Sequence, residues 1–375
     1  MTDDTGTPVP GAARTVVAKI GSSSVTAAGG GVDGAAIERL SADIALVRAA
    51  GHSVVLVSSG AIAAGWAALS GGPRPTDPAT LQAVSAVGQH RLMRVYDDAL
   101  AGHGLSVGQV LLAPLDFVHR QQYLHARQTL ARLLELGVVP VVNENDATSD
   151  DEIRFGDNDR LAALVAHLVA ADLLVLLTDT AGLLTADPRT TDEASLIEEV
   201  VEVDHRLEMM AGGTGSEVGS GGMVSKLAAA KIAAWSGVET VIADAGRPGV
   251  LQAAVAAEPG VGTVFRPRPR RLPARKLWIA FAVASAGTIV VDDGARRALV
   301  EGDASLLPAG VVSVSGRFDT DAAVEIAGTD GVVFAKGLVR HPAERIGTWA
   351  GRRTGDLPEG VAHEVVHRDD LVVLA

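Results

Sequence analysis

Two lysines of this sequence lie where an ammonium group could act on a phosphate. Lys19 comes at the end of the apolar segment TVVAKI, and Lys226 ends the glycine-rich run GSGGMVSK. Of the 32 basic residues only five are lysines, so the sequence otherwise uses arginine. A lysine ammonium is a compact point charge, whereas an arginine is a planar fork. We therefore predict that Lys19 and Lys226 share an anion-binding site, although a lysine at a strand end can also simply reach solvent.

Glycine-rich turns stand next to both lysines. Gly21 and Ser22 follow Lys19 closely, and Gly60 follows another apolar segment, SVVLV. Glycine lets backbone N–H groups approach an anion, and a helix N-terminus adds favourable partial charge. The loop before Lys226 is no Walker A sequence, because no G-K-[ST] occurs, but it can hold phosphates with its amides unless it is an ordinary surface loop. Its candidate residues are Ser220, Gly221, Gly222, Met223, Val224, Ser225 and Lys226.

The hexapeptide FGDNDR places three polar side chains directly before an apolar helical segment. A helix start needs one capping Asp or Asn, so Asp157, Asn158 and Asp159 exceed what capping requires. Other polar residues also follow apolar segments, and each alone could belong to an ordinary turn. These are Ser59, Asn143, Asp146, Thr178 and Asp179.

Two ammonium groups, anion-binding glycines and a ring of Asp and Asn suit phosphoryl transfer from a nucleotide, where catalysis is mostly positioning and charge neutralisation. A carboxylate acceptor would explain the lack of an obvious catalytic His or activated Ser. A glutamate side chain, with a pKa near about 4.3, is already ionised at neutral pH and needs no general base. Asp146 could then bind an ammonium group of the acceptor.

The elements that must position these groups alternate along the first part of the chain. We predict strands over 14–20, 53–57, 106–112, 138–142, 173–177 and 240–243, and helices over 34–50, 78–101, 120–136, 159–170 and 225–236. Short apolar strands alternating with helices indicate an α/β domain with an open, mainly parallel sheet sandwiched by helices. Because ligands bind beyond the carboxyl ends of such strands, we expect the polar groups to meet at one edge of the sheet.

The pattern changes near Arg266. Residues 266–275 are rich in Pro and Arg and read as a linker between a domain at 14–265 and a second one at 276–375. The second domain repeats short apolar runs between Gly and Asp turns, which predicts a small all-β barrel. It has ten basic and fourteen acidic side chains, so strong binding to a nucleic-acid backbone is not expected.

Composition excludes several classes of protein. The chain of 375 residues is 47% hydrophobic, has no cysteine and carries a formal net charge of −13. Disulfide and thiol chemistry are therefore excluded, and a generally basic surface for binding nucleic acid is not expected, although a local basic patch is compatible with this charge. The N-terminal residues do not resemble a signal peptide, and no apolar run reads as a membrane span. We expect a cytoplasmic protein.

Six stretches, in order, resemble the glutamate 5-kinases of the amino acid kinase family. They are KIGSS, VVLVSSGAIAAG, VVPVVNENDA, EIRFGDND, LLTDTAGLLTADPR and GSGGMVSKLAAA. The C-terminal stretches EGDASLLPAGVVSVSGRF and VVHRDDLVVL resemble the PUA domain that many bacterial members carry. The resemblance runs from about residue 14 to the end of the chain.

This resemblance implies that ATP phosphorylates the side-chain carboxylate of L-glutamate to L-glutamyl 5-phosphate, the first step of proline biosynthesis. Lys19, Lys226 and Asp159 would be catalytic, with Asp159 holding both lysines. Glutamate would be bound by Ser59, Gly60, Asn143, Asp146 and Asn158. ATP would be bound by Lys19, Gly21, Ser22, Thr178, Asp179 and the loop from Ser220 to Lys226.

The resemblance also implies partners. Mg²⁺ would enter bound mainly through the nucleotide phosphates, with no dedicated metal site in the protein. Proline would be a feedback inhibitor, the chain would form a dimer or tetramer, and glutamate-5-semialdehyde dehydrogenase could be functionally coupled to it. Membranes and nucleic acids are not expected partners.

Two alternatives stay open at this point. A kinase of the same family could use another acid as acceptor, such as an acylated glutamate, aspartate or carbamate. The other alternative is a nucleic-acid-binding module with a disused kinase domain. Departures from the family pattern in the β domain (FDTDAAV and LVRHPAERI) argue against an RNA-binding role of that domain.

Overall fold

The computed structural model describes residues 12–69, 75–148, 158–186, 194–212, 222–269, 271–281, 283–358 and 362–374. The chain divides into two compact units, Met1–Arg271 and Leu272–Ala375. Each unit has its own sheet and its own core of buried apolar side chains.

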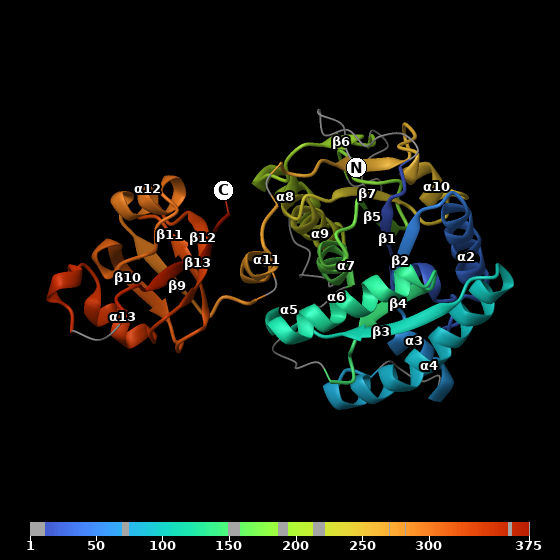
Figure 1. Cartoon of the computed structure of the whole chain (residues 1–375), viewed down its shortest axis with the longest axis horizontal. Coiled ribbons are helices and arrows are strands. Elements are labelled where there is room, and N and C mark those ends of the chain that lie inside the picture. The colour runs from blue at the N-terminus through green and yellow to red at the C-terminus, as the bar shows by residue number, and fades with distance from the viewer. Residues whose placement is uncertain are drawn as a thin grey trace. The chain divides into compact units, whose positions relative to one another are not determined.

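An eight-stranded sheet forms the centre of the first unit (Figure 1). In spatial order its strands are β3 (Val107–Leu112), β4 (Val139–Glu144), β2 (Ser53–Val57), β1 (Thr15–Ile20), β5 (Leu173–Thr178), β7 (Glu239–Asp244), β8 (Gly262–Phe265) and β6 (Glu199–Val200). All neighbours are parallel except β7 and β8. The predicted mainly parallel α/β fold is confirmed.

Helices cover both faces of this sheet, which is why its central strands are apolar without interruption. The helices of the first unit are α1 (Ser22–Val25), α2 (Gly34–Ala49), α3 (Ala61–Leu69), α4 (Pro78–Gly102), α5 (Leu115–Val118), α6 (Arg120–Glu135), α7 (Asn158–Leu168), α8 (His205–Gly212), α9 (Met223–Trp235) and α10 (Val250–Val255). On one side α2 packs against α4 and α10, and on the other α7 packs against α6 and α9 (Figure 1).

The predicted helices and strands of this unit all occur, with ends that move by one or two residues. The sequence did not predict α1, α5, α8, α10, β6 and β8, which have between two and eight residues. Elements of that length contain too few repeats of an apolar period to be recognised.

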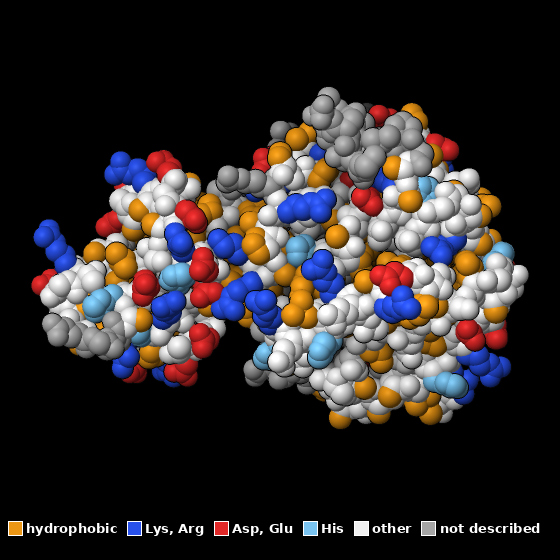
Figure 2. Space-filling view, in the orientation of Figure 1, with side chains coloured by type: hydrophobic (Ala, Val, Ile, Leu, Met, Phe, Trp, Pro, Cys, Tyr) orange, Lys and Arg blue, Asp and Glu red, His pale blue; other side chains and the backbone are white. Residues whose placement is uncertain are grey.

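The second unit holds a five-stranded sheet in the order β10 (Val311–Gly316), β9 (Gly287–Val291), β11 (Ala323–Ala327), β12 (Val333–Val339), β13 (Val366–Val373). Three helices accompany it, α11 (Ala274–Phe281), α12 (Asp293–Glu301) and α13 (Ala343–Trp349). The β sheet is the predicted one, whereas the helices were not predicted. Acidic and basic side chains are interspersed on the face of this unit that Figure 2 shows.

Parts of the expected linker, residues 266–275, belong to the two units. Arg266 pairs with Glu239 at 2.9 Å, and the Arg268 guanidinium lies 4.1 Å from the centre of the Trp235 ring. At the other end of the segment, α11 already begins at Ala274. The first arginines of this segment therefore pack on the first unit.

Within the described residues no helix is long and apolar enough to cross a membrane.

Candidate active site

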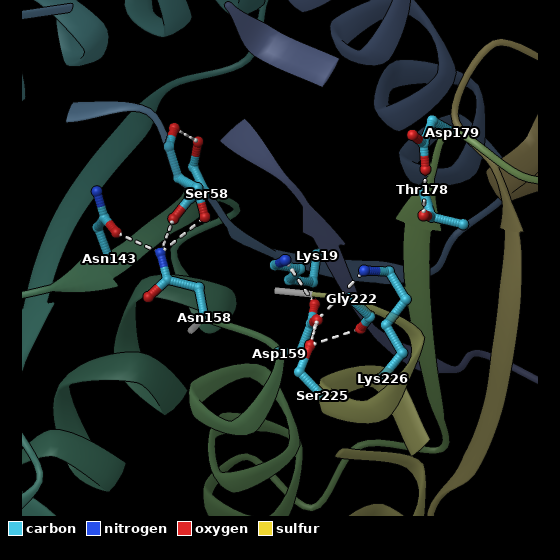
Figure 3. A network of polar contacts seen from close by, with 11 residues as sticks. Lys19, Ser58, Asn143, Asn158, Asp159, Thr178, Asp179, Gly222, Ser225 and Lys226 are labelled. Atoms are coloured by element: carbon cyan, nitrogen blue, oxygen red, sulfur yellow. Dashed lines mark hydrogen bonds and ion pairs between the residues drawn. The ribbon is translucent and has the colours of Figure 1, made fainter. Parts of the chain in front are cut away.

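The order of the central strands brings the candidate residues together. Strands β4, β2, β1 and β5 are consecutive neighbours and run parallel. Their carboxyl ends therefore meet at one edge of the sheet, and each end carries polar groups. Figure 3 shows these side chains at that edge, with Asn158 and Asp159 from the start of α7 between them.

A buried carboxylate links the two lysines, as the sequence predicts for a shared site. Asp159 Oδ1 lies 2.5 Å from Lys19 Nζ, and Asp159 Oδ2 lies 3.4 Å from Lys226 Nζ (Figure 3). The Ser225 hydroxyl donates to Asp159 Oδ2 at 2.6 Å. The Asp159 side chain is wholly buried, and both lysine side chains are less than a tenth exposed.

The environment keeps Asp159 ionised. Burial by itself raises the pKa of this carboxyl, but the ammonium groups of Lys19 and Lys226 and the Ser225 hydroxyl outweigh it and hold the pKa below its usual value. Within this cluster two ammonium groups face one carboxylate, which is a local excess of positive charge. This charge suits an incoming anion.

The packing of α7 against α9 sets the geometry of this cluster. Alanine and leucine side chains face each other across the two helices, and α9 starts at Met223 directly after Gly222. Among the described residues no side chain caps the start of α9, and the backbone N–H groups of a helix start suit an anion. Lys226 lies one turn inside this helix and therefore points its charge at the same place as those amides.

A second network joins three loops beside the lysine cluster. Asn158 Nδ2 lies 2.6 Å from the Ser58 carbonyl oxygen, 2.9 Å from Ser59 Oγ and 2.7 Å from Asn143 Oδ1 (Figure 3). All three partners accept, so they orient the Asn158 amide. Its Oδ1 points away from them, as Figure 3 shows, and is placed to accept a hydrogen bond from a ligand.

Glycine is required where the chain turns from β2 into α3. Gly60 has a φ of +100°, a conformation that other residues rarely adopt. A Cβ there would lie 3.0 Å from Val25 Cγ2. Gly21 is different, since a Cβ would meet only the ends of the Lys19 and Ser23 side chains, at 3.8 and 3.9 Å. Gly21 therefore leaves space next to the Lys19 ammonium group.

Asp146 lies on the α4 side of the site. Its Oδ2 accepts a hydrogen bond of 2.7 Å from Ser85 Oγ of α4. Helix α4 makes another such contact, because Tyr96 and Ser58 share a buried hydrogen bond of 2.8 Å between their hydroxyl groups. Sequence reasoning missed Ser85 and Tyr96, although both recur at helical spacing on the buried side of α4.

Thr178 and Asp179 lie at the end of β5, on the same side as Lys226 in Figure 3. The Thr178 hydroxyl donates to Asp179 Oδ1 at 3.0 Å. Both residues line a cavity of about 340 Å³, whose other lining residues include Ser23 and Ser24. A ligand at the lysine cluster could therefore extend along the carboxyl ends of β1 and β5.

The remaining predicted residues are only partly placed. Ser220, Gly221 and Asp157 lie outside the described residues. Met223 and Val224 form the first turn of α9, where Val224 is 49% exposed. Among the described residues, no group of three or more His, Asp or Glu side chains could hold a metal ion.

Comparison with known proteins matches the two parts of the chain to two family models. The model of the amino acid kinase family matches residues 14–244, and that of the PUA domain matches residues 287–359. A glutamate 5-kinase of Pelobacter propionicus is 45% identical over 365 residues, which cover 96% of this chain and 98% of that protein. A glutamate 5-kinase of Bifidobacterium adolescentis is 48% identical over 367 residues, 96% of each chain.

Among solved structures, a carbamate kinase from Giardia lamblia bound to AMP-PNP is similar over 68% of this chain and 99% of its own. Its TM-score is 0.49, at 16% sequence identity. The curated relatives cover more of this chain, 96% of it, at higher sequence identity.

Proposed function

The chain belongs to the amino acid kinase family, and on that premise we propose that it uses ATP to phosphorylate the side-chain carboxylate of L-glutamate. The product is L-glutamyl 5-phosphate, the first intermediate of proline biosynthesis. Relatives that carry the name glutamate 5-kinase, at 45–48% identity over almost the whole chain, support this acceptor. The chain also carries a PUA domain.

One observation carries the mechanism, namely the buried Lys19–Asp159–Lys226 cluster. During transfer, negative charge spreads over the oxygens of the moving phosphoryl group. Lys19 and Lys226 are held at fixed positions by Asp159, so they can neutralise this charge without first having to reorganise. Asp159 itself is occupied by the two lysines and acts as the residue that positions them.

The acceptor needs no general base in this site. A glutamate side chain is ionised at neutral pH, so its oxygen can attack the phosphoryl group directly. Asp146 and Asn158 Oδ1 are acceptors on the same side of the site and would bind the ammonium group of glutamate. Ser59, Gly60 and Asn143 complete the wall on that side, where Asn158 bonds Ser59 and Asn143.

The nucleotide would lie on the other side of the lysines. We assign its phosphates to the start of α9 and to Gly21 and Ser22, and its remainder to Thr178 and Asp179 with the segment from Ser220 to Lys226. Mg²⁺ would arrive with ATP and be bound mainly by phosphate oxygens, where it would neutralise phosphate charge. The described carboxylate nearest the lysines, Asp159, is already paired with both of them and fits a positioning role better than a metal ligand.

Other expectations from the sequence stay predictions. They are a cytoplasmic location, a dimer or tetramer, inhibition by proline, and coupling to glutamate-5-semialdehyde dehydrogenase. A labile acyl phosphate product gives a chemical reason for such coupling.

Trapping the product tests the proposed function. The purified protein is incubated with Mg-ATP, L-glutamate and hydroxylamine, and the γ-hydroxamate is measured. Hydroxamate that depends on both ATP and glutamate is the expected result. A folded protein that binds ATP but forms no hydroxamate would overturn glutamate as acceptor, and N-acetylglutamate and aspartate would then be tried in the same assay.

A further inference from the structure

Helix α4 presents a line of polar side chains toward the acceptor side of the site. Ser85, Gln89 and Tyr96 are separated by four and seven residues, so they lie on one face of the helix. Ser85 bonds Asp146 after β4, and Tyr96 bonds Ser58 after β2. Gln89 therefore lies between the helix's contacts to these two loops.

Gln89 differs from its two neighbours because its donor is unused. The residue is 8% exposed, and its Nε2 is buried without a hydrogen-bond partner. A buried donor that stays unpaired is costly, so such groups in native proteins usually have a partner or a function. Ser85, one turn before Gln89, and Tyr96, two turns after it, both have hydrogen-bond partners. The unpaired donor of Gln89 is therefore an exception on this face of α4.

The chemistry of the acceptor suggests what completes this bond. An α-amino acid carries its ammonium and carboxylate groups on the same carbon, so a site for one must place a partner for the other a few ångströms away. Asp146 is the proposed partner of the ammonium group. A neutral amide beside it can donate to the carboxylate without competing for Asp146, as a lysine or arginine would.

Building on the proposed function, we propose that Gln89 binds the α-carboxylate of the acceptor through Nε2. Gln89 would then distinguish an α-amino acid from an acid that lacks the α-carboxylate. It would act by holding the acceptor, at a distance from the transferring phosphoryl group. It would bind the ground state and the transition state equally well.

Gln89→Met tests this role, because methionine has a similar length and volume but no donor. The KM for glutamate should rise about 10–100-fold, the effect of losing a hydrogen bond to a charged group. The kcat and the KM for ATP should stay near the wild-type values. The Tm should stay equal or rise, since the variant removes an unpaired buried donor.

A structural role for Gln89 would give the opposite pattern, in which the Tm and kcat fall together. That result, or an unchanged KM for glutamate, would overturn the inference. Gln128→Met is the matched control, because Gln128 is exposed on α6 and the same substitution there should change none of these values. If the wild-type protein forms no hydroxamate from glutamate, the proposed function fails and this inference fails with it. A wild-type protein that forms it, with an unchanged KM in Gln89→Met, refutes Gln89 alone.

Gln89→Glu tests which group of the acceptor is bound. A carboxylate at this position should repel the α-carboxylate of glutamate but accept from the amide of L-isoglutamine, which carries an α-amide instead. The ratio of kcat/KM for glutamate to that for isoglutamine should therefore fall at least about tenfold. No gain in isoglutamine turnover over the wild-type protein would overturn the assignment of the α-carboxylate.

Discussion

At the scale of single residues, the site depends on one buried carboxylate with two cationic partners. Asp159 is wholly buried, and without it both Lys19 and Lys226 would lose this carboxylate partner at the edge of the sheet. Breaking a buried ion pair by removing one partner typically costs more than the pair contributes. Substitutions of the lysines and of Asp159 should therefore have different consequences.

Lys226→Met should lower kcat by about 10²–10³-fold, because its charge acts mostly on the transition state. The KM for glutamate should change little, since the proposed mechanism assigns Lys226 to the nucleotide side. Steady-state hydroxamate assays give both constants, and the Tm shows that the variant is folded. An unchanged kcat would remove Lys226 from the mechanism.

Asp159→Asn should destabilise the protein in a pH-dependent way. The pKa of Asp159 is lower in the folded chain than its ordinary value of 3.8, so the carboxylate adds stability above that pH and loses it as the pH falls through the folded pKa. At pH 7 the variant should lose about 3–5 kcal/mol, the usual cost of breaking a buried pair. Thermal melts from pH 7 to pH 3 should show the gap between the two proteins closing below about pH 4. A gap of constant size would contradict this account.

At the scale of elements, α4 connects the fold to the acceptor side of the site. Helix α4 crosses α3 at a glycine of each helix, Gly88 of α4 and Gly65 of α3. A Cβ on Gly88 would lie 1.7 Å from the Ala61 carbonyl oxygen, and a Cβ on Gly65 would lie 2.0 Å from the Val84 carbonyl oxygen. This close approach fixes the height and rotation of α4. It thereby determines where the polar face that begins at Ser85 meets the loops after β2 and β4.

Gly88→Ala should push the two helices apart. Overpacking of this kind costs about 1–3 kcal/mol, so the Tm should fall by several degrees. The KM for glutamate should rise as well, because the polar residues of α4 move with the helix. Gly102→Ala is the matched control, since a Cβ at this α4 position meets nothing within 4 Å. Equal effects of the two substitutions would show that the crossing does not position the site.

At the scale of the whole molecule, the described site residues all belong to the first unit. The second unit has its own sheet and core, and residues 266–269 pack on the first unit through Arg266 and Arg268. A natural place to end the kinase unit is therefore after Arg271.

A chain that ends at Arg271 should fold and keep its glutamate kinase activity. Its kcat should stay within about threefold of the full chain, as expected when a domain with its own core is separated from another. Circular dichroism and the hydroxamate assay measure folding and turnover on the same sample. A truncated chain that is folded but inactive would show that residues 272–375 supply a needed part of the site.

The sequence by itself determined the parallel α/β fold, the β sheet of the second unit, and the set of polar groups at the strand ends. Those features are local, because an apolar run or a helical period is written in consecutive residues. The pairing of Lys19 and Lys226 as members of one site also followed, since parallel strands and the helices after them share one edge.

Only the tertiary structure decided which groups touch. The bond of Ser225 to Asp159 joins residues 66 apart, and the bond of Ser85 to Asp146 joins residues 61 apart. Helical spacing shows that Ser85, Gln89 and Tyr96 share a face, but it does not show what that face meets. The packing of α4 on α3 sets the partner, and it leaves Gln89 Nε2 buried without a hydrogen-bond partner.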